Sequence, residues 1–398
     1  MVNYLRQIPK EWSLLEFNKI ATLRKTKYIP NPFEHLKCLE LEHFEKETGS
    51  LNGYIDSAQQ SSTKNVFKAG DVLFGKLRPY LKKFNRPNFD GVCSTEIWVL
   101  NGLDTCKNSY LYLLIQTNKF NNICNVSTGT HMPRADWNFV ENIPFFLPPL
   151  PEQEKIAGIL ETWDKAIEKL SDLIEQKKLL KKGLMQKLLT GKTRLNGFTQ
   201  PWKEVKLGEI FNIKKGQGLS KDVLDSKGVY KCILYGELYT KYSEVIKNTI
   251  SRTNKNEKIT SNIGDILIPA STTTSGIDLA NATALFESDV ILGGDINILR
   301  TKKEISPVFF AYLLTHSYKF DIARLAQGIT IVHLYAEFLK SMKVFVPIDT
   351  NEQKAIADVL STADDEINLL NQKLEALKEQ KKGLMQQLLT GQIRVKVN

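Results

Sequence analysis

At 398 residues the chain is too long for one ordinary hydrophobic core, and its length predicts two or three domains. Lysine and arginine outnumber aspartate and glutamate by 54 to 44, which allows a polyanionic partner but does not by itself identify one. The five cysteines are odd in number and never form C-x-x-C, so the composition argues against a zinc site or a disulfide framework. Since no apolar run has the form of a membrane span or a signal peptide, we expect a cytoplasmic protein.

Residues 1–148 are predicted to form a first globular domain. Short apolar runs predict strands at residues 71–74 and 96–100, and a helix is expected over residues 108–121. A last apolar run, IPFFLPPL, predicts the strand that ends the domain.

A basic segment, KLRPYLKKFNRP, separates the first two predicted strands. Its cations can neutralise phosphates while an aromatic ring fixes the loop, so we predict nucleic-acid contacts from Lys76, Arg78, Tyr80, Lys82 and Lys83. A second segment, STGTHMPRADW, lies just before the last strand. Hydroxyl groups, histidine and arginine can reach base edges or phosphates, and the candidates here are Thr128, Thr130, His131 and Arg134. An ordinary solvated loop is the alternative interpretation of the basic segment.

No recognisable catalytic motif is present. The segment GDVLFGKL has the G-x-x-x-x-G-K spacing of a phosphate loop, but Leu77 stands where serine or threonine would hold magnesium. Asn31–Pro32–Phe33 is only a fragment of the tetrapeptide used by adenine methyltransferases. The histidines are scattered, without a metal-ligand cluster. We therefore expect a chain that binds rather than catalyses.

Residues 149–195 and 350–398 are predicted to be two long helices of related sequence. The two stretches align without a gap, with Glu152 opposite Glu352. Apolar residues recur in steps of four and three, the heptad pattern of a coiled coil. In the first stretch they are Ile156, Leu160, Trp163, Ile167, Leu170, Ile174, Leu184 and Leu188. In the second they are Ile356, Leu360, Ala363, Ile367, Leu370, Leu374, Leu377, Leu384 and Leu388.

The ends of both helices have sequence signals. Thr350 and Gln353 predict a capping box, and Gly191 and Gly391 predict left-handed caps. About 40 residues at ~1.5 Å each give a length of roughly 60 Å. Because each apolar seam needs a partner, we expect the two helices to pack antiparallel with pseudo-twofold symmetry. A homo-oligomer of long helices is the alternative.

Residues 196–349 repeat the plan of the first domain in outline. Gly264–Asp265 corresponds to Gly70–Asp71, and Gly328 corresponds to Gly129. The Ser/Thr-rich stretch is expected to be a flexible loop rich in hydrogen-bond donors, unless it is an ordinary surface turn. The candidate contacts in this domain are Ser271, Thr272, Thr273, Thr274, Thr330 and His333.

The motif KKGLMQ-LLTG recurs almost unchanged in both long helices, although the fold itself is not expected to need it. This repetition predicts a protein partner that docks twice. The candidate docking residues are Lys182, Met185, Gln186, Lys382, Met385 and Gln386.

The block PPLPEQEKIA, a heptad helix and KKGLMQKLLTG, repeated near the end of the sequence, resembles the specificity subunit of type I restriction–modification enzymes. The phrases GDVLFGKLRPYL, CSTEIWVL, GTHMPRADW, GDILIPAS and GGDINILR resemble the target-recognition domains of that family. The resemblance covers essentially the whole chain. It implies an α/β (α+β) fold, in which two target-recognition domains are separated by two long antiparallel coiled-coil helices in a pseudo-twofold tandem repeat.

The resemblance also implies a function. In this family the subunit has no catalytic activity, each recognition domain reads one half of a bipartite DNA target, and the helices set the gap. Two methyltransferase subunits dock on it, and restriction–translocase subunits join them. S-adenosylmethionine, ATP and magnesium belong to those partners, so no cofactor is expected on this chain. The second domain departs from the pattern, with His333 where the first has Arg134 and no match to Trp137.

Other functions remain open at this stage. A coiled-coil scaffold would hold protein partners without touching DNA, and only a DNA-binding chain would show strongly salt-dependent DNA binding. A standalone DNA-binding protein would need no enzyme partner. A cryptic nuclease or methyltransferase would turn over DNA as a purified chain.

Overall fold

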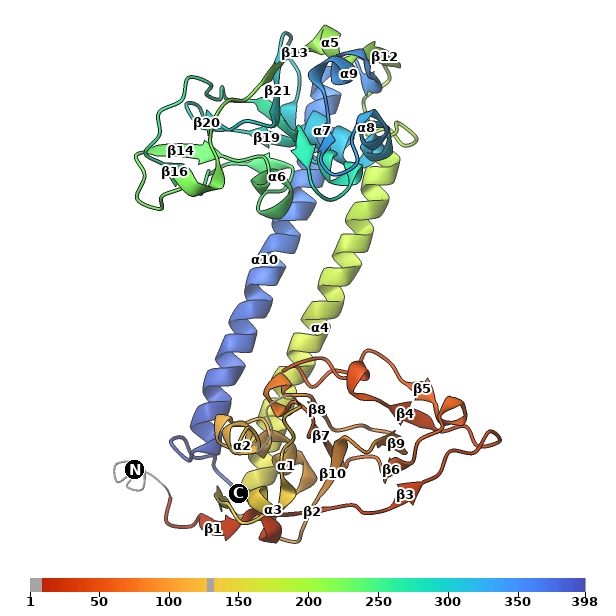
Figure 1. The fold of residues 1–398 in the computed structure, drawn as a ribbon, viewed down its shortest axis with the longest axis vertical. Helices are drawn as coiled ribbons and strands as arrows, with labels where there is room; N and C mark the ends of the chain where they lie inside the picture. The colour runs from red at the N-terminus through yellow and green to blue at the C-terminus, as the bar shows by residue number, and fades with distance from the viewer. Residues whose placement is uncertain (1–8, 127–131, 398) are drawn as a thin grey trace. The chain divides into compact units, whose positions relative to one another are not determined.

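The computed structural model describes residues 9–126 and 132–397 and divides the chain into two compact units (Figure 1). The first unit comprises residues 1–171 and 373–398, and the second comprises residues 172–372. The two long helices, α4 (Leu150–Leu188) and α10 (Thr350–Leu389), each contribute one segment to each unit. The division of the chain into four domains at residues 148, 195 and 349 stays a prediction.

The predicted heptad seam is buried or half-buried along both helices. Leu160 and Leu360, for example, have no exposed surface. In the first unit, Asp164 of α4 pairs with Lys381 of α10, and in the second, Lys181 pairs with Asp364, both at 2.5 Å. These pairs place the start of one helix beside the end of the other in each unit, so the expected antiparallel packing is confirmed within each unit.

A lysine in the seam is neutralised rather than buried alone. Lys177 occupies the heptad position at which α10 has Leu377, and its ammonium lies 2.6 Å from the carboxylate of Glu366. Lys177 and Lys381 are both half-buried. A half-buried ion pair costs less desolvation than a fully buried one, so the helices tolerate these interruptions.

The start of α10 lacks the predicted capping box of Thr350 and Gln353. The carbonyl of Asp349 accepts from the N–H groups of Glu352 and Gln353, and its carboxylate accepts from Asn351 N–H, so the capping residue is Asp349. Gln353 turns into the domain instead: its Nε2 donates to the carbonyl of Pro347, and its Oε1 accepts from Ser306 N–H. The predicted capping box does not form, because the side chain of Gln353 is buried. A buried amide must find its hydrogen-bond partners among the groups around it, and here these belong to the domain.

The predicted left-handed caps are confirmed. Gly191 and Gly391 have φ of 67° and 72°. Gly191 N–H donates to the carbonyl of Leu188, and Gly391 N–H donates to that of Leu388, which are bonds expected at a left-handed glycine cap.

A buried glutamate near the start of each long helix joins helix, domain and chain end. Glu152 accepts from Trp12 Nε1 at 3.2 Å and from Arg394 Nε and Nη2 at 2.7 and 2.9 Å. In the second unit, Glu352 accepts from Trp202 Nε1 at 3.3 Å and from Arg194 Nη2 at 2.6 Å. We call these two sets the first clasp (Trp12, Glu152, Arg394) and the second clasp (Trp202, Glu352, Arg194).

The first unit is a mixed, mainly antiparallel α+β structure. Its described strands order as β1–β11, as β2–β10–β7–β8, and as β3–β6–β9–β4–β5. The strands are β1 (Ser13–Glu16), β2 (Ala21–Leu23), β3 (Lys27–Tyr28), β4 (Lys37–Leu39), β5 (Ile55–Asp56), β6 (Lys64–Phe67), β7 (Val72–Gly75), β8 (Phe84–Asn85), β9 (Gly91–Ser94), β10 (Ile97–Gly102) and β11 (Pro144–Leu147). The strands predicted at residues 71–74 and 96–100 correspond to β7 and β10, and β7 is fully buried, which excludes a phosphate loop there.

The predicted helix over residues 108–121 is wrong in one respect, because the chain forms two helices. They are α1 (Asn108–Leu114) and α2 (Asn118–Cys124), and a third short helix, α3 (Trp137–Val140), precedes β11. Ile115 is the C-terminal cap of the first helix, and Thr117 caps the start of the second, since its Oγ1 accepts from Phe120 N–H at 3.2 Å. Threonine forms such a cap as readily as it continues a helix, so periodicity alone did not reveal the break.

The second unit repeats these pairings only in part: where the first unit has the sheet β3–β6–β9–β4–β5, the second has a sheet of three strands, and its described strands also form an additional pair. Its strands order as β12–β23, β13–β21–β17–β19–β15, β16–β14–β20 and β18–β22. The strands are β12 (Trp202–Lys206), β13 (Phe211–Lys215), β14 (Tyr230–Ile233), β15 (Val245–Ile246), β16 (Arg252–Thr253), β17 (Asp265–Pro269), β18 (Ser271–Thr272), β19 (Thr283–Leu285), β20 (Ile291–Leu292), β21 (Ile296–Thr301), β22 (Val332–His333) and β23 (Lys343–Pro347). The helices are α5 (Leu207–Ile210), α6 (Glu237–Thr240), α7 (Pro307–Tyr312), α8 (Lys319–Leu325) and α9 (Ala336–Ser341).

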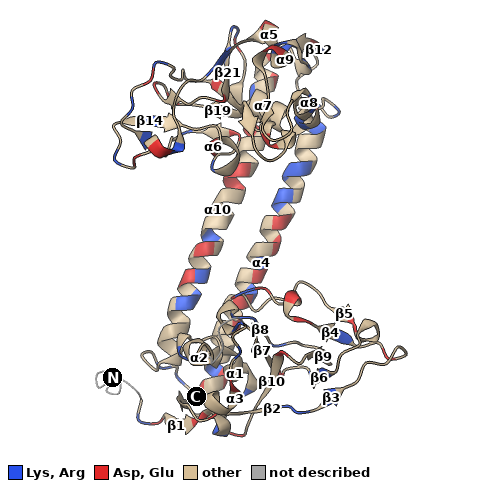
Figure 2. Ribbon diagram, in the orientation of Figure 1, with Lys and Arg blue, Asp and Glu red and all other residues tan. Residues whose placement is uncertain are grey.

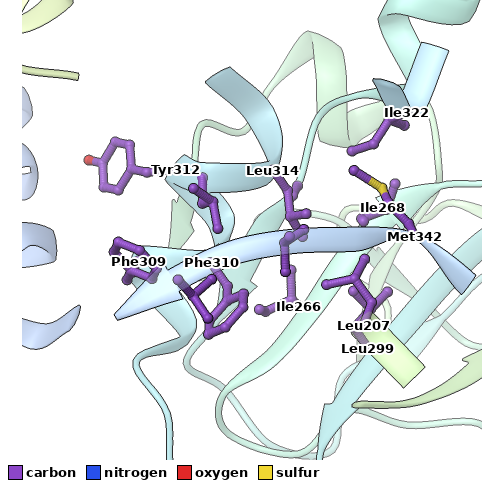
Figure 3. Packing of buried hydrophobic residues seen from close by; sticks show 14 of the residues in the cluster. Leu207, Ile266, Ile268, Leu299, Phe309, Phe310, Tyr312, Leu314, Ile322 and Met342 are labelled. Atoms are coloured by element: carbon purple, nitrogen blue, oxygen red, sulfur yellow. The ribbon is translucent and has the colours of Figure 1, made fainter. Parts of the chain in front are cut away.

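Each long helix end is part of a domain core. In the second unit, Leu188 of α4 and Leu360 of α10 belong to the same buried cluster as Phe309 and Phe310 of α7. Figure 3 shows side chains of this cluster from α7, β17 and β21. In the first unit, Leu160 and Leu388 share a cluster with Phe17 and Tyr110. Helix and globular part are therefore one folded body within each unit.

Candidate nucleic-acid interface

In the first unit the two predicted contact segments lie side by side. Where β7 ends, the carbonyl of Lys76 accepts from Ala135 N–H at 2.9 Å, and Arg78 N–H donates to the carbonyl of Pro133 at 2.8 Å. Leu77 and Arg134 form an antiparallel bridge. Residues almost 60 positions apart in the sequence thus form one surface. Thr128, Thr130 and His131 lie outside the described residues.

The turn after Lys76 has an uncommon backbone. Arg78 and Lys82 both have left-handed conformations, with φ of 51° and 47°. This region costs about 1–2 kcal/mol for a residue with a side chain. The turn is held by hydrogen bonds from Leu81 N–H to Arg78 and from Lys82 N–H to Pro79, at 2.9 and 2.8 Å. It presents Tyr80 with 53% of its surface exposed, together with the exposed Arg78.

Three further cations of this surface, Lys82, Lys83 and Arg134, have partners in the protein. Lys82 lies 2.9 Å from the carboxylate of Glu47, and Arg134 Nε donates to Glu96 at 2.9 Å. Both pairs are partly exposed, and a phosphate could replace either carboxylate. Lys83 is different, because its ammonium donates to the carbonyl of Leu41 at 2.5 Å and burial lowers its pKa. Arg78 and Tyr80 are therefore the better-presented candidates.

In the second unit the two predicted segments also meet. Strands β18 and β22 pair antiparallel, with Ser271 opposite His333 and Thr272 opposite Val332. The surface formed by residues 271–275 and 327–333 occupies the place in the second unit that residues 76–83 and 132–135 occupy in the first, between the end of a central strand and a short helix. We call these surfaces the second and the first interface.

The expected flexible Ser/Thr loop is only partly correct. Ser271 and Thr272 are strand residues with 3% and 1% exposure, so neither side chain is free to meet a large ligand. The Thr272 and Thr274 hydroxyls are 2.8 Å apart, and the Thr274 hydroxyl also bonds to Asp278. Because these hydroxyls satisfy one another, the segment can be ordered and partly buried. Thr273, Thr274 and Ser275 are exposed.

The other segment of the second interface is a hairpin. Gln327 and His333 exchange both backbone N–H···O bonds, at 2.9 and 2.7 Å, and Thr330 is exposed at the tip. His333 is half-buried, with its ring 6.0 Å from that of Tyr335. The sequence interpretation missed two exposed isoleucines at this tip, Ile329 and Ile331, because the apolar run ITIV suggests a buried strand.

The corresponding glycine–aspartate pairs are structural. Gly70 and Gly264 both have φ of 87°. Asp71 accepts two hydrogen bonds from Arg24, and Asp265 accepts two from Arg300. Both aspartates are almost completely buried, so they support the central strands rather than face a ligand.

The predicted docking residues divide into two groups. Lys182, Gln186, Lys382 and Gln386 are exposed, whereas Met185 and Met385 are half-buried against the cores of their units. The expectation that the fold does not need the repeated motif is therefore wrong for its apolar residues. Both helices carry Lys as well as Asp and Glu (Figure 2), but the charged residues of the repeated motif are all lysines, Lys181, Lys182 and Lys187 in α4 and Lys381 and Lys382 in α10.

Among residues 9–126 and 132–397, no group of three or more His, Cys, Asp or Glu side chains could hold a metal ion. The five cysteines are free and buried. No helix in the described part of the chain has the length and apolar character needed to cross a membrane.

Comparison with known proteins gives one consistent result. The model of the type I restriction modification DNA specificity domain matches residues 9–176 and 199–379. The MjaVIII specificity subunit of Methanocaldococcus jannaschii is 29% identical over 285 residues, which are 67% of this chain and 66% of that protein. The putative MjaX specificity subunit of the same organism is 28% identical over 430 aligned residues, covering 98% of this chain and 95% of that protein.

Two solved structures share the fold. The S subunit of a type I restriction–modification system from M. genitalium matches with a TM-score of 0.61 at 18% identity, covering 96% of each chain. A chain from a study of complex assembly and conformational transition of the type I R-M system matches with a TM-score of 0.60 at 19% identity, covering 97% of this chain and 99% of that one. At this identity the likeness concerns the fold alone.

Proposed function

We propose that this chain, which belongs to the type I restriction modification DNA specificity family, is the subunit that selects the DNA target of a type I restriction–modification complex. The family model matches two separate stretches, one for each interface described above. Each unit would read one half of a bipartite target.

One observation supports this function most strongly. In both units, two segments distant in the sequence meet at the end of a central strand, and together they present cations, hydroxyl groups or aromatic rings. The positions correspond, but the residues differ, with Arg78 and Tyr80 in one unit and Thr273 and Thr330 in the other. A repeated frame with different exposed side chains is suited to reading two different half-sites.

Different side chains of the two interfaces would contact phosphates and bases. Arginine and lysine side chains would neutralise phosphates and fix the register on the duplex. Threonine hydroxyls, His333 and Arg78 would reach base edges, where hydrogen bonds discriminate one base pair from another. The carboxylates of Glu47 and Glu96, which now pair with Lys82 and Arg134, would give way to phosphates on binding.

The long helices would set the gap between the half-sites and dock two methyltransferase subunits. This part of the proposal is supported by the exposed polar residues of the repeated motif, Lys182 and Gln186 in α4 and Lys382 and Gln386 in α10. Since the motif occurs once in each helix, a partner that binds one copy can bind the other in the same way.

Catalysis would belong to the partners. The methyltransferase subunits would bind S-adenosylmethionine, and restriction–translocase subunits would bind ATP and magnesium. The chain itself would contribute only binding and orientation, which agrees with the lack of a recognisable catalytic motif in its sequence.

Co-expression with the methyltransferase encoded beside this chain tests the proposal. The expected result is a complex of one chain with two methyltransferases, seen by native mass determination, together with methylation of one split sequence with a fixed gap across a host genome. If no complex forms and no split sequence is methylated, the chain is not a specificity subunit, and a scaffold role would explain it better.

A further inference from the structure

The tip of the hairpin in the second interface exposes two apolar side chains. Ile329 is fully exposed and Ile331 is 48% exposed. Exposed apolar surface is unfavourable in water, so a β-branched pair at one protruding turn is a feature that binding can use.

The base of the hairpin is held firmly. Besides the paired backbone bonds between Gln327 and His333, Leu334 N–H donates to the carbonyl of Ala270 at 2.9 Å. The side chain of the buried Asn297 donates to the carbonyl of Leu334, also at 2.9 Å. Because the base is ordered before binding, insertion of the tip would cost little conformational entropy.

The turn itself depends on a glycine. Gly328 has φ of 127°, and a Cβ atom at this position would lie 2.0 Å from the carbonyl oxygen of Ile331. Only glycine allows the chain to reverse this tightly, and the reversal makes the tip narrow.

The size and surroundings of the tip favour one kind of partner. A stable protein–protein interface buries about 800 Å² on each partner, far more than two isoleucine side chains supply. A step between neighbouring base pairs is small, flat and apolar, and isoleucine is one of the residues that proteins insert there. The exposed Thr330 lies between the two isoleucines, and the half-buried His333 ends the hairpin, so groups able to bond base edges flank the apolar tip.

We propose that Ile329 and Ile331 form a wedge that enters a base step in the half-target read by the second unit and kinks the duplex there. The proposal rests on the function proposed above. The wedge reads sequence indirectly, since unstacking is easiest at flexible pyrimidine–purine steps. The half-target of the second unit is therefore expected to contain, or to border, a TA or CA/TG step.

The test uses the complete complex with its methyltransferase subunits and a duplex carrying the mapped target. 2-Aminopurine replaces one base at a time through both halves, and its fluorescence rises where stacking is lost. The methyltransferases extrude the bases that they methylate, so those positions are set aside. With the wild-type chain we expect increased fluorescence at one further step of a single half. The Ile329→Ser/Ile331→Ser variant should lose that signal and bind the target about 10- to 100-fold more weakly, given that an unstacked step is exchanged for the contacts it permits.

Ile250→Ser is the matched control, because Ile250 is 68% exposed in the same unit but lies outside the hairpin. It should leave both signal and affinity unchanged. If the wild-type complex binds the split target and no step is unstacked apart from the methylated bases, the wedge proposal is wrong while the proposed function stands. If the double variant loses methyltransferase subunits but keeps the fluorescence signal, the tip contacts protein and the wedge is wrong as well. If the wild-type complex binds no split target, the proposed function fails first.

Discussion

The two clasps and the two interfaces repeat to very different degrees. Each clasp uses tryptophan, glutamate and arginine in the same contacts, with Glu152 buried in one unit and Glu352 in the other. The interfaces share only their position in the fold: one presents a basic turn around Arg78, and the other presents a hairpin with Ile329. The residues that join helix to domain are the same in both units, whereas the residues of the two interfaces differ. This is expected if one fold, used twice, recognises two different DNA half-sites.

The largest expected effect concerns the first clasp. Glu152→Ala leaves the indole N–H of Trp12 without its acceptor and removes two of the three carboxylate bonds of Arg394, whose Nη1 still donates to Glu11. A buried indole N–H without an acceptor and the lost charge-assisted bonds together cost about 3 kcal/mol, so the free energy of unfolding should fall by about that amount. Chemical denaturation of the wild-type and variant chains measures this difference in the free energy of unfolding.

Glu154→Ala is the control, because Glu154 is exposed two residues further along the same helix and pairs with Lys107 at the surface. It should cost less than about 1 kcal/mol. Equal losses in the two variants would contradict the role assigned to the clasp.

The next effect separates two neighbouring cations of the first interface. Arg78→Ala should weaken DNA binding by about 2 kcal/mol and relax recognition at one base pair of its half-site, because Arg78 is proposed to reach a base edge. Lys83→Ala should leave DNA affinity unchanged, because its ammonium already bonds to the carbonyl of Leu41. DNA titrations of the assembled complex at several salt concentrations measure both affinities. An equal loss of DNA affinity in the two variants would contradict the different roles of Arg78 and Lys83.

The repeated helices predict equivalent partner sites. Lys182→Glu should weaken one methyltransferase site by roughly tenfold, or about 1.4 kcal/mol. Lys382→Glu should do the same at the other, and both lysines are exposed, so folding should be unaffected. Native mass spectra should show complexes with one methyltransferase for each single variant and none for the double variant at low concentration. Loss of both subunits from a single variant would argue against two independent sites.

The smallest effect is a difference in acid stability between the units. Burial by itself raises the pKa of Glu244, but the hydrogen bond with His316 and the nearby Lys181 lower it more, so the pKa lies below the ordinary value of 4.5. The ionised carboxylate therefore stabilises the fold above pH 4.5, and this contribution is lost as pH falls through the lower folded pKa.

Glu244→Gln should consequently destabilise the protein at pH 7 and by less as the pH falls below 4.5. The first unit has Gln116 where the second has His316, and Gln116 bonds to the carbonyl of Tyr112. Gln116→Ala should change stability by an amount independent of pH. Denaturation midpoints measured from pH 7 to pH 3 would show whether only the first variant changes with pH.

The long helices could be predicted from sequence because their signals are local. Heptad spacing fixed which residues pack, and the glycines fixed where the helices end. The start of α10 was predicted correctly, but its capping box was not, because Gln353 bonds to Pro347 and Ser306, and residue 306 is far away in the sequence.

The interfaces were harder to predict. The sequence indicated the right segments, and the structure brings them together in pairs, as at Leu77 and Arg134 or Ser271 and His333. Which side chains are exposed depended on tertiary contacts: Thr272 is buried by its strand partner, and Lys83 turns to Leu41. The isoleucines at the hairpin tip were missed because an apolar run normally indicates burial.

The central claim is that each unit reads its own half of the target. The most direct test is to map methylated sequences in cells that contain the methyltransferase with either the wild-type chain or the Thr273→Ala/Thr330→Ala variant, both residues being exposed in the second interface. The account predicts relaxed recognition in one half only, with the other half and the gap unchanged. Relaxation of both halves, or a changed gap, would contradict it.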